Sequence, residues 1–517
     1  MISGTKKDIL TEEDDKVPPT IGTPKLSKSK FMAGCQCLKR LYLQVHEPEL
    51  AREPDEAKQA IFDQGHEVGR LATEAFPDGV RVEEDYLSHH KEMERTRALL
   101  GDKNIPAIFE AAFIFDGVRV RVDILERQAR NRWRMIEVKS TKRIKDEHYQ
   151  DVAIQKYVLE GSGLKLSEAC LMHLNGDYVY DGKEYNLGRL FATNNLAEDI
   201  EELMEQIPAQ VAEQHRILTL GTPPEVEPGD RCKSPYDCEF FDLCNPEIPD
   251  HYVENLPGIR KQVIKRLLDQ GIKLIQDIPS DFGLNGLQRR ACLCVQKDEP
   301  YFGKELSSEL KKLKYPLYFM DFETYDPAIP RYAGMRPFDP IPFQWSVHVQ
   351  RKPGSDLEHY EFLAENANDP RKAFIETLLK VLEEQRGKGH IVVYTSFESS
   401  RLNELAGWFP DYAHRIEKVK ARLWDLHPLV KNYVYHPEFY GSFSLKDVLP
   451  ALVPHMTYEG MDVADGIAAG LAYDAMIKGG LSDDEIEGLR KALLEYCGQD
   501  TLGMVELIKV LKNNAKY

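Results

Sequence analysis

The sequence predicts an α/β protein with more than one domain. Its 517 residues exceed what a single hydrophobic core usually holds. In both halves of the chain, apolar runs of strand length are followed by segments with helical spacing. These patterns divide the chain into a tail at residues 1–25, which we expect to be disordered, a mixed domain at 26–250, a helical linker at 251–310 and a second mixed domain at 311–517.

The composition fits an ordinary globular protein, with 42% hydrophobic and 29% charged residues. No stretch reaches the roughly 20 apolar residues that cross a bilayer. The polar first twenty residues lack the apolar segment of a signal peptide. We therefore expect a cytoplasmic protein without a membrane partner.

The net charge of −18 argues against a nucleic-acid partner, because phosphate contacts favour a basic surface. Two considerations weaken that argument. Carboxylates that bind metal add negative charge that the bound cations offset, and an acidic protein can still carry a local basic groove. The charge therefore excludes neither a DNA partner nor an RNA partner.

The first domain is expected to contain a hairpin, a third strand and a helix. Residues 107–125 alternate or run apolar around Asp116-Gly117, a dipeptide typical of two-residue hairpin turns. A third strand is predicted at 132–138, and a helix at 148–159.

Two carboxylates and a lysine mark the first candidate site. Asp123 falls near the end of one predicted strand, and Glu137 and Lys139 lie two apart on the next, so that both point to one face. Carboxylates on adjacent strands are suitable ligands for Mg²⁺ or Mn²⁺. A neighbouring lysine is able to orient or deprotonate a water molecule for phosphodiester hydrolysis. The alternative for so short a motif is a solvated strand face with a simple Glu–Lys pair.

In this context residues 26–246 resemble the RecB-like branch of the PD-(D/E)xK nucleases, which have a restriction-endonuclease-like fold, and in particular the branch that carries an iron–sulfur cluster. The resemblance implies that His66, Asp123, Glu137 and the main-chain carbonyl of Val138 bind metal, and that Lys139 is the catalytic lysine.

The resemblance also implies a DNA-facing Gln-x-x-x-Tyr motif in the helix that follows. That motif is not literal here, because Gln155 and Tyr157 are only two residues apart. We assign these two residues to nucleic-acid binding on the resemblance alone.

Four cysteines bracket the first domain. Cys37 precedes it, and Cys232, Cys238 and Cys244 follow with five residues between neighbours. An odd total of nine cysteines in a cytoplasmic chain favours a metal site over a disulfide framework. Four thiolates are able to hold either a [4Fe–4S] cluster or zinc. The arrangement of one cysteine before and three after resembles the iron–sulfur RecB-like nucleases, which implies a [4Fe–4S] cluster.

Cys35 is the alternative to Cys37. The segment that begins CLKRLYL matches the family's pattern from Cys37, so we prefer that residue. The other cysteines, Cys170, Cys292, Cys294 and Cys497, are expected to be structural.

The linker is predicted to form a helix, a glycine turn and a second helix. Its Leu256-Pro257-Gly258-Ile259 turn resembles a helix-hairpin-helix element, in which backbone N–H groups contact phosphate. Gly258 and Lys261 are therefore candidate nucleic-acid contacts, and a plain helical linker is the alternative.

The last domain carries a second set of acids. Asp321 and Glu323 lie on one face of a predicted strand at 316–324, and Glu398 begins a helix after another strand at 390–396. Tyr496 and Asp500 are four apart in a predicted helix at 482–511, where Ser482 and Glu485 have capping-box spacing. Four converging carboxylates suit a two-metal site.

These motifs make residues 314–517 similar to DnaQ-like 3′–5′ exonucleases of the RNase H-like fold, in the DEDDy subgroup. The resemblance implies that Asp321, Glu323, Glu398 and Asp500 bind metal and that Tyr496 orients the attacking water. Glu398 departs from the family pattern, which has aspartate there. Asp425, in a segment at 423–430 that we expect to be a strand, is expected to be structural.

The sequence thus predicts a hydrolase with two Mg²⁺- or Mn²⁺-dependent nuclease sites acting on DNA, with single-stranded or 3′ ends as substrates and repair or defence as settings. Two alternatives stay open. One site alone is active and the other domain only binds nucleic acid, or the chain is an RNA-processing exonuclease.

Overall fold

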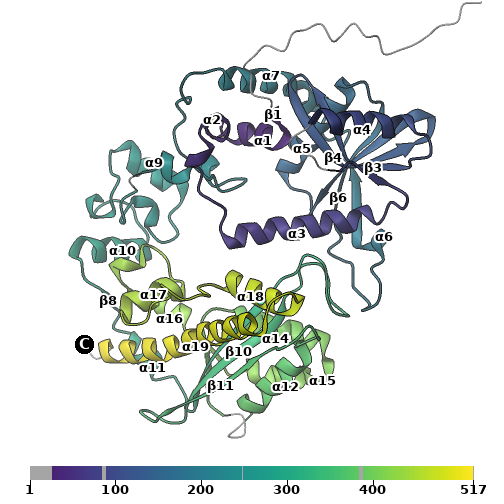
Figure 1. Cartoon of the computed structure of the whole chain (residues 1–517). Coiled ribbons are helices and arrows are strands. Elements are labelled where there is room, and N and C mark those ends of the chain that lie inside the picture. The colour runs from purple at the N-terminus through teal and green to yellow at the C-terminus, as the bar shows by residue number, and fades with distance from the viewer. Residues whose placement is uncertain (1–25, 84–88, 247, 384–387, 516–517) are drawn as a thin grey trace, which may run out of the picture. The chain divides into compact units, whose positions relative to one another are not determined.

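The computed structural model describes residues 26–83, 89–246, 248–383 and 388–515 (Figure 1). The predicted tail at 1–25 lies outside the described residues. Helices hold about 48% and strands about 18% of the residues, in several sheets, so the predicted α/β class is confirmed at that level. The described residues form two compact units, one within 26–53, 65–175 and 186–246 and the other within 54–64, 176–185 and 248–515.

Helices and strands alternate through the first 246 residues. They are β1 (Leu26–Ser27), α1 (Lys28–Gln36), α2 (Leu38–His46), α3 (Glu56–Thr73), β2 (Val80–Arg81), α4 (His89–Gly101), β3 (Ala107–Phe115), β4 (Val118–Gln128), β5 (Arg132–Lys139), α5 (Asp146–Gly161), β6 (Leu166–Leu174), α6 (Leu187–Leu190), β7 (Phe191–Asn195), α7 (Glu201–Leu218) and α8 (Phe241–Cys244).

The first unit is built on a seven-stranded sheet. Its strand order is β2-β3-β4-β5-β6-β7, with β1 added beside β4. The predicted hairpin is β3–β4, and both Asp116 and Gly117 at its turn have positive φ, 48° and 73°, as a two-residue type I′ turn requires. The helix α5 packs on β3, β4 and β6, and its buried residues join the core of the sheet.

The strands β4 and β5 separate at a fork. Their antiparallel pairing runs from Gln128↔Arg132 to Ile124↔Ile136 and includes no later pair. Beyond that point β5 continues beside β6 alone, while the start of β4 pairs in parallel with the two residues of β1. Asp123 and Glu137 are the first residues past the last pair, so the fork opens between them.

Residues 248–515 hold the remaining elements. They are α9 (Lys261–Asp269), α10 (Gly286–Lys297), β8 (Tyr301–Phe302), α11 (Leu306–Leu310), β9 (Leu317–Tyr325), β10 (Ile341–Gln350), β11 (Leu357–Leu363), α12 (Arg371–Leu382), β12 (His390–Val393), α14 (Phe397–Trp408), α15 (Pro410–Lys420), β13 (Leu423–Asp425), α16 (His427–Tyr433), β14 (Val434–Tyr435), α17 (Leu445–Leu452), α18 (Gly466–Lys478) and α19 (Asp483–Asn514).

The second unit is built on a five-stranded sheet of order β11-β10-β9-β12-β13. The strands β11, β10 and β9 are antiparallel neighbours, and β12 runs parallel to both β9 and β13. Tyr318, Met320 and Phe322 of β9 pack in one core with α12, α14 and α15. The alternate residues Leu317 and Phe319 belong to the other core, which contains α18 and α19. The sheet therefore has helices on both faces, and the long helix α19 follows β9 and β10 (Figure 1).

Two predicted elements differ from the structure. The first helix of the predicted hairpin linker is only a 3₁₀ turn at Val253–Asn255, and Gly258 (φ 58°) leads directly into α9. The predicted strand at 423–430 ends at Asp425, because Pro428 opens the helix α16 there and proline suits a first helical turn. The capping box of Ser482 and Glu485 is present at the start of α19.

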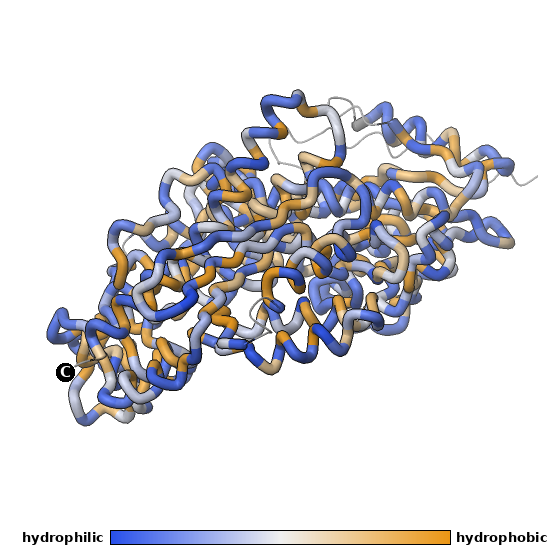
Figure 2. Tube along the Cα trace, turned by 90° about the horizontal axis from the view of Figure 1, so that it is seen from below, coloured by the Kyte–Doolittle hydropathy of each residue, from blue (hydrophilic) through white to orange (hydrophobic). Residues whose placement is uncertain are grey.

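No helix in the described ranges is long and apolar enough to cross a membrane. Apolar and polar stretches alternate along the trace (Figure 2).

Candidate functional site

The fork in the first unit gathers the charged residues that the first motif predicted. We call Lys28, Asp123, Glu137, Lys139 and Asp151 the fork cluster. Asp123 Oδ2 accepts a hydrogen bond of 2.7 Å from the backbone N–H of Val138, so a side chain of β4 contacts the backbone of β5 at the point where the strands separate. Lys139 Nζ lies 2.6 Å from Glu137 Oε1 and 2.5 Å from Asp151 Oδ2.

Two members of the fork cluster are absent from the sequence prediction. Lys28 Nζ lies 2.7 Å from Glu137 Oε1 and 3.3 Å from Asp151 Oδ1. It is the first residue of α1, directly after β1, so the pairing of β1 with β4 brings it to the fork. Asp151 lies four residues before Gln155 on α5, and this helical spacing was the only sequence signal for it.

The two lysines of the fork cluster offset most of the negative charge of its three carboxyl groups. Burial raises the pKa of Glu137, but the ammonium groups of Lys139 and Lys28 outweigh it and hold that pKa well below its usual range. Burial, reinforced by the charge of Glu137, raises the pKa of Asp123 to about 8. The fork therefore holds one firmly ionised carboxylate and one that is readily protonated.

The other residues assigned to this site lie in different surroundings. Gln155 is fully buried and donates to Glu137 Oε2 at 2.7 Å. Its side chain therefore contacts Glu137 and does not reach the surface, where a nucleic acid would bind. Tyr157 donates to Asp116 Oδ2 at the β3–β4 turn at 2.9 Å. His66 is exposed on α3, and no hydrogen bond or ion pair in the described part of the chain joins it to Asp123 or Glu137.

The four predicted cluster cysteines line one pocket of the first unit. Cys37, Cys232, Cys238 and Cys244 all contribute to its wall, and Cys35 does not. None of the nine cysteines forms a disulfide. Cys35 instead lies beside Gln210 and Gln214 of α7, with contacts of 3.9 and 3.6 Å to its sulfur.

Side chains near Cys37 fix the distant cysteine segment. Gln36 donates to the carbonyl oxygens of Arg231 and Tyr236 at 2.6 and 2.7 Å, and Arg40 pairs with Glu239 at 2.8 Å. These contacts close the wall of the pocket from both ends of the first domain. Four thiols without disulfides therefore line one pocket, and no three of their sulfur atoms lie within 4.8 Å of one another in the described residues.

The second unit brings together the four acids of the second motif, which we call the four-acid site. Asp321 and Glu323 project from β9, Glu398 from the first turn of α14 and Asp500 from α19. Glu323, Glu398 and Asp500 are between 2% and 7% exposed. In the described part of the chain, none of the four forms an ion pair.

Burial and mutual repulsion dominate the electrostatics of the four-acid site. Burial and the charge of Asp500 raise the pKa of Asp321 to about 8. Burial followed by the charge of Asp321 raises the pKa values of Glu323 and Glu398 well above their usual range. Burial raises the pKa of Asp500 to about 6, against hydrogen bonds from Tyr458 and Tyr496 and the charge of Lys446. The site therefore favours either protons or bound cations.

Glu398 lies in the four-acid site, although the resemblance in the sequence predicts an aspartate at this position. It lies beside Asp321, and its Oε2 atom is buried without a hydrogen-bond partner. Such an orphaned buried oxygen fits a missing cation, since buried polar atoms are normally paired. Asp425 has a different role, because its Oδ1 accepts from the N–H groups of Thr395 and His427, both at 2.9 Å.

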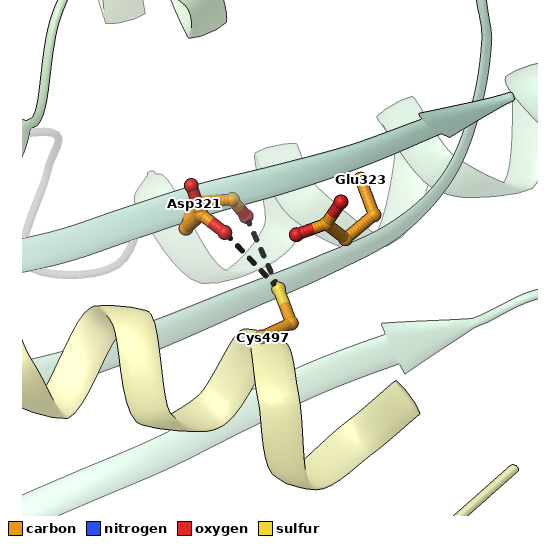
Figure 3. Close-up of side chains that lie close together, drawn as sticks. All are labelled: Asp321, Glu323 and Cys497. Atoms are coloured by element: carbon orange, nitrogen blue, oxygen red, sulfur yellow. Dashed lines mark hydrogen bonds between the residues drawn. The ribbon is translucent and has the colours of Figure 1, made fainter. Parts of the chain in front are cut away.

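Two tyrosines and a cysteine complete the surroundings of the four-acid site. The predicted Tyr496 is buried beside Asp500, and burial together with that carboxylate raises the pKa of its phenol. Tyr458, which the sequence analysis missed, also donates to Asp500. Cys497, expected to be structural, has its sulfur 3.5 Å from Asp321 Oδ2 (Figure 3). Its position directly after Tyr496 was the only signal in the sequence.

A cavity of about 490 Å³ in the second unit reaches the four-acid site. Its wall includes Glu323, Gly466 at the start of α18, and the partly exposed side chains of Phe397 and Ile467. Gly258 of the predicted hairpin turn lines a different cavity of about 420 Å³, together with His427 and Lys431.

Comparison with known proteins finds one matching family and a few matching chains among solved structures. Residues 318–444 match the family described as "Domain of unknown function (DUF2779)". The matched segment contains Asp321, Glu323 and Glu398 and ends before Asp500. No curated protein matches the chain.

Four chains of solved structures match. One, described as "Crystal structure of SSO0001", is 15% identical over 43% of this chain and 87% of that chain, with a TM-score of 0.21. A likeness at that TM-score carries no argument about function.

Proposed function

We propose that the chain is a metal-dependent nuclease that hydrolyses phosphodiester bonds of DNA. Its main centre is the four-acid site, in a domain of the RNase H-like, DnaQ-like class. The observation that carries the proposal is the convergence of three buried carboxylates and the half-buried Asp321, from β9, α14 and α19, without a pairing lysine or arginine among the described residues. Such a set is costly unless cations or protons neutralise it.

Divalent cations fit this donor set. Asp321, Glu323, Glu398 and Asp500 offer only oxygen atoms, the ligands that Mg²⁺ and Mn²⁺ prefer. The unpartnered Oε2 of Glu398 supplies an independent reason to expect a cation there. Bound cations would activate a water molecule and stabilise the leaving oxygen of a phosphodiester.

The protein's own groups would position the reactants. Tyr496 keeps its phenol protonated beside Asp500, so its hydroxyl is able to orient a water molecule at that carboxylate. The cavity that begins at Glu323 is lined by Phe397 and Ile467, which offer apolar surface for a terminal base. Gly466, at the start of α18, lies in the wall of the same cavity next to Asp465, which caps that helix.

A basic segment lies next to this centre in the sequence. Residues 257–316 contain twelve Lys and Arg against seven Asp and Glu, a net charge of +5 in a chain whose total is −18. Within it Arg289, Arg290, Lys297 and Tyr301 line one cavity of about 440 Å³. Basic side chains with an aromatic ring suit a single nucleic-acid strand. In this proposal the segment supplies the local basic surface that a nucleic-acid partner needs in an acidic protein.

The fork cluster is the second proposed nuclease centre, of the RecB-like PD-(D/E)xK class. Its support is the meeting of Asp123, Glu137 and Lys139 where β4 and β5 separate. In this proposal the carboxylates hold the metal, with the Val138 carbonyl as a further ligand, and Lys139 positions water. His66 would have to approach from its exposed position on α3 to act as a ligand.

The cysteine pocket is proposed to hold a [4Fe–4S] cluster. Cys37, Cys232, Cys238 and Cys244 would ligate it, which would tie α1 and α2 to the segment that ends the first unit. Zinc is the alternative occupant of four thiolates.

One observation favours the version with a single active site. At the fork, two ammonium groups already contact Glu137 and Asp151, whereas the four-acid site has no such pairing in the described residues. In that version the four-acid site hydrolyses and the first unit only binds nucleic acid.

Separate Asp321→Ala and Lys139→Ala variants test the proposal. Full-length protein is incubated with Mg²⁺ or Mn²⁺ and with single- and double-stranded DNA and RNA, each labelled at the 3′ or the 5′ end. We expect Asp321→Ala to abolish stepwise loss from 3′ ends, and Lys139→Ala to affect a separate cleavage. Asp425→Asn serves as a control for an acid outside the site. If wild-type protein cleaves none of the polymers, or if Asp321→Ala cleaves like wild type, the proposal is wrong.

A further inference from the structure

The sulfur of Cys497 lies among the acids of the four-acid site. One ligand atom each from Asp321, Glu323 and Cys497 lies within 4.8 Å of the others. The thiol is directed at Asp321, with Sγ 3.5 Å from Oδ2 and 3.9 Å from the backbone oxygen (Figure 3). Cys497 is fully buried, so its position is set by packing and not by solvent.

The helix α19 is held on the sheet in the register that places Cys497 there. Thr501, one helical turn later, shares hydrogen bonds of 2.8 Å with both Ser346 and His348 of β10. Gln344, two residues from Ser346, donates to the carbonyl of Leu493 on the same helix at 2.7 Å. Because these contacts lie on either side of Cys497, the thiol has little freedom to turn away from β9.

A second, independent feature indicates that a ligand is missing at this position. Glu398 is 2% exposed and lies beside Asp321, and its Oε2 has no hydrogen-bond partner. A cation between Asp321, Glu323 and Cys497 would lower the repulsion that Glu398 meets from Asp321.

We propose that Cys497 is a metal ligand, and that the four-acid site binds one thiophilic divalent ion of the zinc class through Asp321, Glu323 and the Cys497 thiolate. On binding, the thiol proton leaves to solvent and a sulfur–metal bond replaces the S–H···O contact with Asp321. Thiolate sulfur favours Zn²⁺ and Co²⁺ over Mg²⁺, whereas a site of carboxylates alone suits Mg²⁺, Ca²⁺ or Mn²⁺. The inference deepens the proposed function by naming the class of one of its ions.

Cobalt and zinc titrations of the full-length protein test this. Wild type and Cys497→Ser are stripped of metal and titrated with Co²⁺, and the thiolate-to-cobalt charge-transfer absorbance is followed. The difference between the two proteins isolates Cys497, because the cysteines of the pocket are common to both. Cys294→Ser is the matched control, since Cys294 is a buried thiol of the same unit on α10.

We expect Cys497→Ser to lose one thiolate–cobalt band and to bind Zn²⁺ at the four-acid site at least about tenfold more weakly. Its Mg²⁺ affinity should be unchanged, and Cys294→Ser should match wild type. Equal cobalt spectra and equal zinc affinities for wild type and Cys497→Ser would overturn the inference. If Cys497→Ser fails to fold, Asp321→Asn provides the second test, because it should weaken the same cobalt band while leaving every thiol in place.

The titration also separates this inference from the proposed function. A cobalt band that depends on Cys497 in a protein that cleaves no nucleic acid would sustain the metal ligand and reject the nuclease. Mg²⁺-supported cleavage by a protein whose zinc affinity is the same with and without Cys497 would sustain the nuclease and reject the metal ligand.

Discussion

Replacing Asp321 by asparagine should stabilise the metal-free protein while destroying its metal response. Asp321 is a half-buried carboxylate whose pKa is raised to about 8, first by desolvation of the carboxyl group and then by the charge of Asp500. A carboxyl group whose pKa is higher in the folded than in the unfolded state costs stability above the unfolded value. The neutral amide removes that cost. A residue with a merely structural role would give the opposite sign.

The magnitude follows from the pKa. At pH 7 the difference between the ordinary value of 3.8 and that pH corresponds to about 4 kcal/mol, at about 1.4 kcal/mol for each pKa unit. The amide brings an N–H pair that needs partners, and an unsatisfied donor costs about 1–3 kcal/mol. The net gain for Asp321→Asn is therefore about 1–3 kcal/mol without metal. In a unit of this size each kcal/mol raises the melting temperature by roughly 2–4 °C.

Thermal unfolding in the presence of a chelator and then of excess Mn²⁺ measures both effects. Wild type should gain about 3 kcal/mol at a Mn²⁺ concentration one hundred times the dissociation constant, and Asp321→Asn should gain much less. Asp474→Asn is the matched control. This buried aspartate pairs with Arg331 and Lys478, so its loss should destabilise by on the order of 3 kcal/mol. If Asp321→Asn melts below wild type in chelator, the repulsive four-acid site is refuted.

Three further changes test the rest of the molecule. Lys28→Met should lower the free energy of unfolding by on the order of 2 kcal/mol at pH 7, because it removes one of the two ammonium groups from Glu137, whereas Lys28→Arg should not. Because the pKa of Glu137 is depressed, this loss should shrink in denaturant titrations as the pH falls below the ordinary pKa of 4.5. An equal loss at every pH would contradict the prediction. Cys238→Ser should abolish bound iron and the brown colour of purified protein, measured by metal analysis, and a colourless wild type loaded with zinc would reject the cluster. Metal-free wild type should lose stability as the pH rises from 5 to 8, because the raised pKa values of Asp321 and Asp500 mean that the unfolded chain binds fewer protons than the folded protein there. Mn²⁺ should flatten this dependence of stability on pH. Stability that rises with pH in the absence of metal would be inconsistent with the four-acid site.

Turns, strands and helix caps were predicted correctly from the sequence where residues within a few positions of one another determine them. The Asp116-Gly117 turn, the strand that bears Asp321 and Glu323 and the Ser482 capping box all follow from residue preferences within a few positions. Helical spacing likewise placed Tyr496 and Asp500 on one face of α19. Spacing of two on β5 placed Glu137 and Lys139 together, and the structure shows them paired at 2.6 Å.

Sequence patterns predicted the wrong element where one or two residues end a helix or a strand. The helix expected before Gly258 is a single 3₁₀ turn, and the strand expected to run through residue 430 stops at Asp425. In both places a proline or a glycine redirects the backbone within an otherwise apolar run. Gln155, assigned to nucleic acid, is buried against Glu137, because the face of α5 that meets the sheet is fixed by packing.

By itself the sequence determined which acids, thiols and lysines are available and which of them share a strand or a helix face. Only the tertiary structure decided that Lys28 meets Glu137 from more than a hundred residues away, that Cys497 faces Asp321, and that Cys37 lines one pocket with the three cysteines at the end of the first domain. The reason is physical. Neighbours along a strand or helix are set by backbone geometry, whereas partners across the chain are set by how β1 pairs with β4 and how α19 packs on β10, which no local pattern encodes.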